Sequence, residues 1–100
     1  MRIEWDEMKN RSNQAKHGIS FEEAAHIFID PLLVMVQDRL EDGEERWQSI
    51  GMVAGVLMLP VAHTIKDDTD TEGGDVEVFR IISARPVTKT ERNRYESEDR

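Results

Sequence analysis

The sequence predicts an α+β fold, with a small antiparallel sheet of about four strands, two helices before it and one after it. Helix start signals occur near the two ends of the chain, at Asp6, Ser20 and Thr88. Between them, from Leu32 to Arg85, residues alternate or form apolar runs as strands do. The connections between these runs are short, so we expect an antiparallel meander with the helices packed on one face.

The first helix is predicted to run from the N-cap Asp6 to about His17, with Gly18 closing it at the C′ position. Residues 3–5 are predicted to form a short strand or an extended lead-in. A 3-4-3 spacing predicts a thin buried stripe, formed by Trp5, Met8, Ser12 and Ala15.

A capping box predicts the start of the second helix, with Ser20 at the N-cap and Glu23 three residues later. The pair Asp30-Pro31 should end it, because the residue before a proline avoids the helical region. We expect its apolar residues to pack inward: Phe21, Ala24, Ala25, Ile27 and Phe28.

The strand region begins with a β run over Leu32–Gln37 and an acidic turn around Asp42-Gly43. Arg46–Ala54 alternates between two faces, and Gly55–Ile65 is apolar enough to be an interior strand. Pro60 lies within that interior strand and cannot donate a ladder hydrogen bond. It therefore predicts a bulge or an unpaired position.

The last third of the chain predicts a polar loop, a strand and a helix. Lys66–Asp75 reads as a long polar loop, and Val76–Arg85 as a further strand. The sequence Thr88-x-x-Glu91 is a second capping box, so a C-terminal helix should run to about Ser97.

The composition predicts one soluble domain over residues 1–100. There is no cysteine, which excludes disulfides, a thiolate metal site and a cysteine nucleophile. The longest apolar stretch, Met52–Ala62, is too short for a bilayer, which needs about 20 residues. No signal peptide is recognised, so we expect a cytoplasmic protein that does not contact a membrane.

The net charge of −8 is unevenly distributed, because much of it lies in two acidic runs, Asp38–Glu45 and Asp67–Glu77. Both runs are predicted to be solvated turns, and neither has the spacing of a calcium-binding loop. Alternatively, they attract a basic partner protein or tune the access of RNA.

A compact cationic segment opposes this overall charge. Four basic residues fall within ten positions, with Glu91 as the local acid: Arg85, Lys89, Arg92 and Arg94. Cations gathered against the global charge predict an anionic ligand, and phosphate is the commonest candidate. Metal-free RNA cleavage needs a base, an acid and cations that stabilise charge on the phosphate oxygens.

The chain has suitable residues for each of these roles. Arg46, Arg80 and Arg85 are the candidate phosphate cations, expected to converge from separate strands on one rim of the sheet. His63 and Tyr95 are the candidate proton-transfer groups. The candidate RNA-backbone contacts lie on the first and last helices: Lys16, Lys89, Arg92 and Arg94. The three histidines have no metal-ligand spacing, so neither a metal nor another cofactor is expected.

Each candidate also has a structural alternative. Arg80 could be a strand arginine paired with a carboxylate, and Arg46 could form a surface ion pair with Glu45. His63 could cap the edge of the core by hydrogen bonding, and Tyr95 could pack the last helix on the sheet. Lys16 could simply interact favourably with the dipole at the C-terminal end of its helix, and the basic residues of the last helix could form a solvated face.

The residues along most of the chain resemble the BrnT toxin family. The N-terminal part of the resemblance is carried by Trp5-Asp6, Lys9, Asn13, Lys16-His17-Gly18, Ser20-Phe21, Ala24, Phe28 and Asp30-Pro31. The later part is carried by Glu45-Arg46, Ile50-Gly51, His63-Thr64, Arg80-Ile-Ile-Ser-Ala-Arg85, Glu91-Arg92 and Tyr95. The resemblance implies a RelE-like fold and the toxin half of a type II toxin–antitoxin pair.

It further implies a ribonuclease that inhibits translation and is neutralised by a BrnA-like ribbon-helix-helix antitoxin. Operator DNA would be bound only through the antitoxin complex. Arg46, His63, Arg80, Arg85 and Arg92 match the family's motifs. Two other classes stay open, namely a binding module that cleaves nothing and a relative that poisons DNA topology by binding gyrase.

Overall fold

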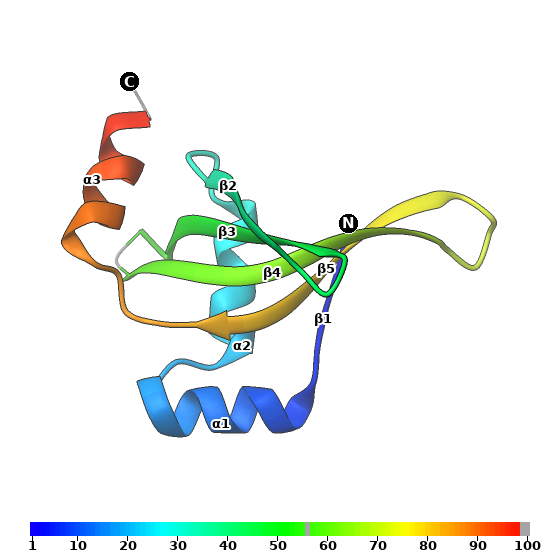
Figure 1. The fold of residues 1–100 in the computed structure, drawn as a ribbon, viewed down its shortest axis with the longest axis horizontal. Coiled ribbons are helices and arrows are strands. Elements are labelled where there is room, and N and C mark those ends of the chain that lie inside the picture. The colour runs from blue at the N-terminus through cyan, green and yellow to red at the C-terminus, as the bar shows by residue number, and fades with distance from the viewer. Residues whose placement is uncertain (56, 99–100) are drawn as a thin grey trace.

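The computed structural model describes residues 1–55 and 57–98, in which three α-helices and one 3-10 helix accompany a five-stranded sheet (Figure 1). The sheet order is β1-β5-β4-β3-β2, antiparallel throughout except that β1 pairs with β5 in parallel. The elements are β1 (Arg2–Trp5), α1 (Glu7–His17), α2 (Phe21–Ala24), the 3-10 helix η1 (Ala25–Ile29), β2 (Val34–Glu41), β3 (Glu44–Val53), β4 (Leu57–Thr69), β5 (Asp75–Ala84) and α3 (Lys89–Glu98).

The predicted fold class is confirmed, and the sheet has one strand more than the four expected. The additional strand is β1, where the sequence indicated a strand or an extended lead-in. Residue 56, within the strand predicted over Gly55–Ile65, lies outside the described residues. No helix in the described part of the chain is long and apolar enough to cross a membrane.

The predicted helix ends are confirmed, because they depend on local hydrogen bonds. The Asp6 carboxylate accepts from the backbone amides of Met8 and Lys9, and Gly18 ends α1 at φ 72°. Ser20 and Glu23 form the first capping box, and Thr88 and Glu91 form the second.

The buried stripe predicted for α1 is wrong. Met8 is 80% exposed, Ser12 and Ala15 are also exposed, and the buried residues of the helix are Asn10 and Asn13. Their amides satisfy backbone groups of other elements, so burial follows hydrogen bonding here rather than hydrophobicity. The Asn10 side chain accepts from the Phe21 amide, and the Asn13 side chain donates to the Ala84 carbonyl, both at 2.8 Å.

The prediction of a loop over Lys66–Asp75 is also wrong. β4 continues to Thr69 and β5 starts at Asp75, so the two strands form a long hairpin that projects from the body of the protein (Figure 1, yellow-green). Residues 70–74 make the turn, where the Asp70 carboxylate accepts from the amides of Glu72 and Gly74. Side chains exposed on both faces leave no apolar alternation, and without it the strands read as a loop.

The helices cover both faces of the sheet, not one face as expected. α1, α2 and η1 cover the face that carries Leu59, Val61 and Phe79, which form the larger apolar cluster with Phe21 and Ile27. α3 lies over one end of the opposite face, where a smaller cluster gathers: Val34, Ile50, Met58 and Tyr95. We call this second face the open face, because α3 leaves its other end uncovered.

Gly51 allows η1 to pack directly on β3. A Cβ atom at this position would lie 2.8 Å from the Ile27 Cβ and 3.0 Å from the Ile27 carbonyl oxygen. Any larger side chain would therefore push the helix off the sheet. The sequence predicted a bulge or an unpaired position at Pro60, but Pro60 lies opposite Ile50 in the register of β3 and β4. The register shift between β4 and β5 lies two residues further on, at Ala62/His63.

A cationic open face as the candidate nucleic-acid interface

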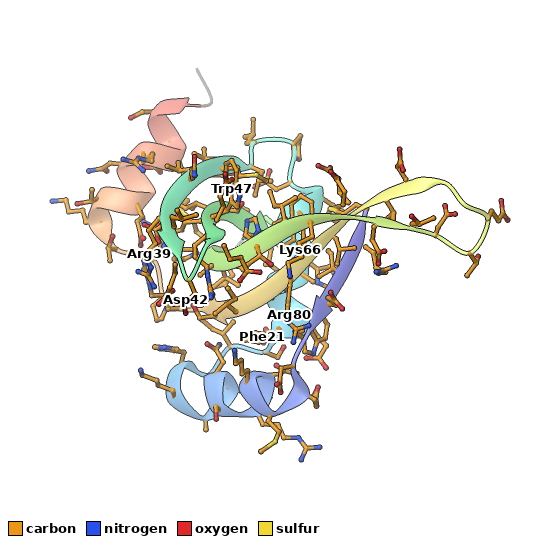
Figure 2. All side chains as sticks on the ribbon, turned by 45° about the vertical axis from the view of Figure 1, so that its right-hand side comes forward. Phe21, Arg39, Asp42, Trp47, Lys66 and Arg80 are labelled. Atoms are coloured by element: carbon orange, nitrogen blue, oxygen red, sulfur yellow. The ribbon has the colours of Figure 1, made fainter. Side chains whose placement is uncertain are left out.

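Strand register brings Glu4, Thr64 and Arg80 side by side on the open face. Glu4 on β1 and Thr64 on β4 both lie opposite Arg80 of β5. Lys66 lies opposite Val78 in the next pair on the same face, and Figure 2 labels Lys66 and Arg80 there. Arg46 joins this face, because its neighbour Trp47 pairs with His63 on the other face.

Part of the open face is hollowed. A cavity of about 410 Å³ lies over β1, β5 and β4. Its lining includes three cations and three carboxylates around a threonine: Arg2, Lys66, Arg80, Glu4, Asp67, Asp68 and Thr64. A concave surface of this kind, with several cationic donors, can hold a phosphate group of a nucleic acid.

Three cations of this face, Arg80, Lys66 and Arg46, make ion pairs without a hydrogen bond to another described residue. An Arg80 nitrogen lies 3.8 Å from a Glu4 carboxylate oxygen, and the Lys66 ammonium lies 3.2 Å from Glu44. Arg46, 23% exposed, lies 3.5 Å from Glu44 and 3.8 Å from Glu41, and its Nε is buried with no hydrogen-bond partner among the described residues. Ion pairs of this exposure contribute little to stability, so these donors can exchange to an incoming anion.

Arg85 lies beyond the end of β5 and is held quite differently. Its guanidinium donates two hydrogen bonds to the Glu91 carboxylate, at 2.8 and 2.5 Å. The hydrogen bond from Arg85 lowers the pKa of Glu91 to about 2, and the hydrogen bond to Glu91 raises the pKa of Arg85. The pair joins the end of the sheet to the first turn of α3.

His63 lies in the core on the opposite face. It is 0% exposed, stacks on Phe79 and meets Phe28 edge-on. Its Nε2 lies 2.7 Å from the Ser49 hydroxyl, and its Nδ1 lies 3.3 Å from the Thr64 carbonyl. Burial lowers the pKa of His63 to about 4, so the ring is neutral near pH 7.

Tyr95 is buried between α3 and the sheet, at 5% exposure. Its hydroxyl donates to the Asp30 carboxylate at 2.7 Å, and that carboxylate also accepts from the amides of Leu32 and Met52. Burial alone raises the pKa of Asp30, but these three hydrogen bonds outweigh it and lower the pKa below its usual value. The geometry matches the packing alternative for Tyr95.

Four further basic residues are exposed on the helices. Lys16 lies in the last turn of α1, and Lys89, Arg92 and Arg94 lie on α3. None of the four forms an ion pair with another described residue. Arg92 shares a shallow hollow of about 370 Å³ with His17, so the ends of α1 and α3 face the same part of the surface.

The structure therefore brings together Arg46 and Arg80 of the five predicted catalytic residues. Arg85 and Tyr95 lie at the end of the open face that α3 covers, and His63 lies on the opposite face; each is held in a hydrogen-bonded packing arrangement. Sequence reasoning placed Thr64 in the strand over Gly55–Ile65 without a role, and it missed Lys66 because the end of β4 was taken for a loop. Their alternate spacing, matching the alternation of Val78 and Arg80, was the signal that could have found them. No group of three or more metal-ligating side chains occurs within residues 1–55 and 57–98.

Fold and site together define a small α+β protein whose sheet presents a hollow lined by arginine, lysine and carboxylate side chains. The family model described as "Ribonuclease toxin, BrnT, of type II toxin-antitoxin system" matches residues 5–91. The chain therefore belongs to the BrnT toxin family.

Among solved structures, the chain is similar to the Brucella abortus ribonuclease toxin BrnT, with 23% sequence identity and a TM-score of 0.62. The match covers 89% of this chain and 99% of the Brucella chain, which shows a shared fold. No curated protein matches the sequence.

Proposed function

We propose that this toxin is an endoribonuclease that cleaves RNA without a metal ion and uses the open face as its active surface. The observation that carries the proposal is the family match over residues 5–91. It is supported by Arg46 and Arg80, which share one face and keep their hydrogen-bond donors available.

In this mechanism the 2′-hydroxyl of the RNA loses its proton and attacks the adjacent phosphorus, while the bond from phosphorus to the 5′-oxygen breaks. The products are a 2′,3′-cyclic phosphate and a 5′-hydroxyl, whose oxygen takes a proton from water. Negative charge grows on the non-bridging oxygens, and Arg46 and Arg80 stabilise it, because a guanidinium meets two phosphate oxygens at once. The carboxylates of Glu4 and Glu44 lie beside these cations and can accept a proton. The exposed lysine and arginine side chains of α1 and α3 extend the contact with the RNA backbone.

The proposal includes the partners that the family implies. A ribbon-helix-helix antitoxin would neutralise the toxin in the cytoplasm, and operator DNA would be bound only by that complex. The strongly acidic β4–β5 hairpin supports a basic partner, because the hairpin projects from the body of the protein (Figure 1) and its carboxylates are exposed.

Induction of the protein in growing cells tests the activity. Wild-type protein should arrest growth and cleave purified RNA at the same rate with and without EDTA, while a double Arg46→Ala, Arg80→Ala variant should do neither. Normal growth and intact RNA with folded wild-type protein would contradict the proposal. Cleavage that EDTA abolishes would contradict its metal-free step.

A second candidate function is a binding module that keeps the fold but cleaves nothing. The observation that favours it is the carboxylate found beside each of Arg46, Arg80 and Arg85, in a chain of net charge −8. The same induction experiment separates the two. The module would co-purify with a small basic protein, leave RNA intact and behave identically when both open-face arginines are replaced.

A further inference from the structure

The buried hydroxyl of Thr64 is an unexplained polar group on the open face. Thr64 is 2% exposed and lines the 410 Å³ hollow, yet its Oγ1 has no hydrogen-bond partner among the described residues. Native proteins rarely leave a buried polar atom unpaired, because the lost hydration is not recovered. A ligand that accepts a hydrogen bond from this hydroxyl would remove the cost.

The cations around Thr64 are those with uncommitted donors. Lys66 and Arg80 line the same hollow and form ion pairs without a hydrogen bond. Arg2, at the rim, is instead hydrogen-bonded to Asp68 at 2.6 Å. The hollow thus contains the unpaired Thr64 hydroxyl and two cations without hydrogen bonds, Lys66 and Arg80. Its carboxylate Asp68 is already hydrogen-bonded to Arg2.

We infer that this hollow binds one backbone phosphate of the RNA, with Thr64, Lys66 and Arg80 as its donors. The inference rests on the proposed ribonuclease function and adds Thr64 and Lys66 as binding residues. A phosphate has enough oxygens to accept from a hydroxyl and two cations together. In the free protein, Glu4 and Glu44 hold Arg80 and Lys66, so these carboxylates compete with the phosphate.

The experiment measures binding of an RNA whose 2′-hydroxyls are methylated, which prevents cleavage, to the full chain. Thr64→Val keeps the shape of the side chain and removes the hydroxyl. It should weaken binding roughly tenfold, the loss expected for a hydrogen bond to a charged group, and leave the melting temperature unchanged or higher. Thr64→Ser should restore binding.

Glu4→Gln should have the opposite effect, because it removes the competing charge beside Arg80. We expect binding to tighten about threefold, against no more than about 1.5-fold for Glu72→Gln, a matched control on the projecting hairpin. Equal tightening by both variants would attribute the effect to net charge and contradict the competition.

Binding of the valine variant within twofold of wild type would overturn the phosphate site and leave the ribonuclease proposal standing. Absence of RNA binding by the wild type would overturn both. If Thr64→Val does not fold, titration of the wild type with inorganic phosphate, followed at the backbone amides, replaces it. Shifts centred on Thr64, Lys66 and Arg80 support the site, and no shifts there overturn it.

Discussion

Arg80 and Arg85 are five residues apart, yet they differ in what holds them. Arg80 lies within β5 on the open face, 3.8 Å from Glu4 with no hydrogen bond, whereas Arg85 donates two hydrogen bonds to Glu91. Fixed guanidinium groups of the second kind stabilise an element, and loosely paired groups of the first kind can meet a ligand. The comparison shows that two arginines of one sequence motif differ in whether their donors are committed to hydrogen bonds, which residue type alone does not reveal.

The largest effect is expected from Arg46→Ala. Loss of one preorganised cation should reduce RNA cleavage about 100-fold, because such groups act mainly in the transition state. Stability should change by less than about 0.5 kcal/mol, since its ion pairs are weak. Arg39→Ala is the matched control, because Arg39 pairs across the strands with Arg46 and also contacts Glu41 but is far more exposed. Equal losses in both variants would break the distinction between the half-buried Arg46 and its exposed cross-strand neighbour.

His63 provides a pH-dependent test on the opposite face. Its pKa is about 6.5 when unfolded and about 4 when folded, so between these values the unfolded state binds the additional proton. Stability should therefore fall as the pH drops from 6.5 to 4, by a total on the order of 3 kcal/mol. Ser49, Phe28, Phe79 and the Thr64 carbonyl surround the ring, and none of them titrates in this range.

Chemical denaturation at several pH values measures this slope. His63→Gln should abolish most of it, whatever its own stability, and should leave cleavage by the folded fraction near that of wild type. An unchanged slope would contradict the buried neutral ring. If His63→Gln loses as much cleavage activity as Arg46→Ala, His63 has a catalytic role after all.

Glu91→Gln tests how much the ion pair between Arg85 and Glu91 contributes to stability. The substitution removes the negative charge that accepts hydrogen bonds from Arg85, and it weakens the capping box with Thr88. We therefore expect a loss of about 1–2 kcal/mol in the free energy of unfolding. The wild-type contribution should be lost below about pH 4.5, as the carboxylate protonates toward its folded pKa of about 2. Glu96→Gln, exposed on the same helix, should change stability by less than about 0.5 kcal/mol.

The smallest effect is expected from Tyr95→Phe, which keeps the ring and removes the hydroxyl that donates to Asp30. Thermal unfolding should report a loss of about 1 kcal/mol, while the rate of RNA cleavage stays within about twofold of wild type. A selective loss of cleavage with unchanged stability would assign Tyr95 a role in proton transfer that its burial does not suggest.

Local chemistry allowed much of the fold to be predicted from the sequence. The caps at Asp6, Ser20 and Thr88 require only neighbouring residues, and each was located correctly. The α1 stripe failed because Asn10 and Asn13 are buried by hydrogen bonds to segments distant in sequence, which apolar spacing cannot reveal.

Which site residues share a face depends on an irregularity in β5. Strict alternation would place Ile81 and Ala84 on opposite faces, yet both lie in the same apolar cluster. The register shift opposite Ala62/His63 accounts for this, because it adds one residue to β5. The additional residue therefore places Arg85 on the open face with Arg80, but at the end that α3 covers, where Glu91 holds its guanidinium. The convergence of Arg46, Arg80 and Arg85 was expected from motifs alone, which do not show that α3 and Glu91 separate Arg85 from the uncovered end of the face.

The rate of RNA cleavage by Arg80→Ala compared with Arg85→Ala, each normalised to its folded fraction, tests the central claim most directly. We predict that Arg80→Ala loses about 100-fold in rate with unchanged stability, and that Arg85→Ala is destabilised but cleaves within a few-fold of wild type. The reverse pattern, a folded Arg85→Ala variant without activity beside an active Arg80→Ala variant, would contradict the assignment of the open face.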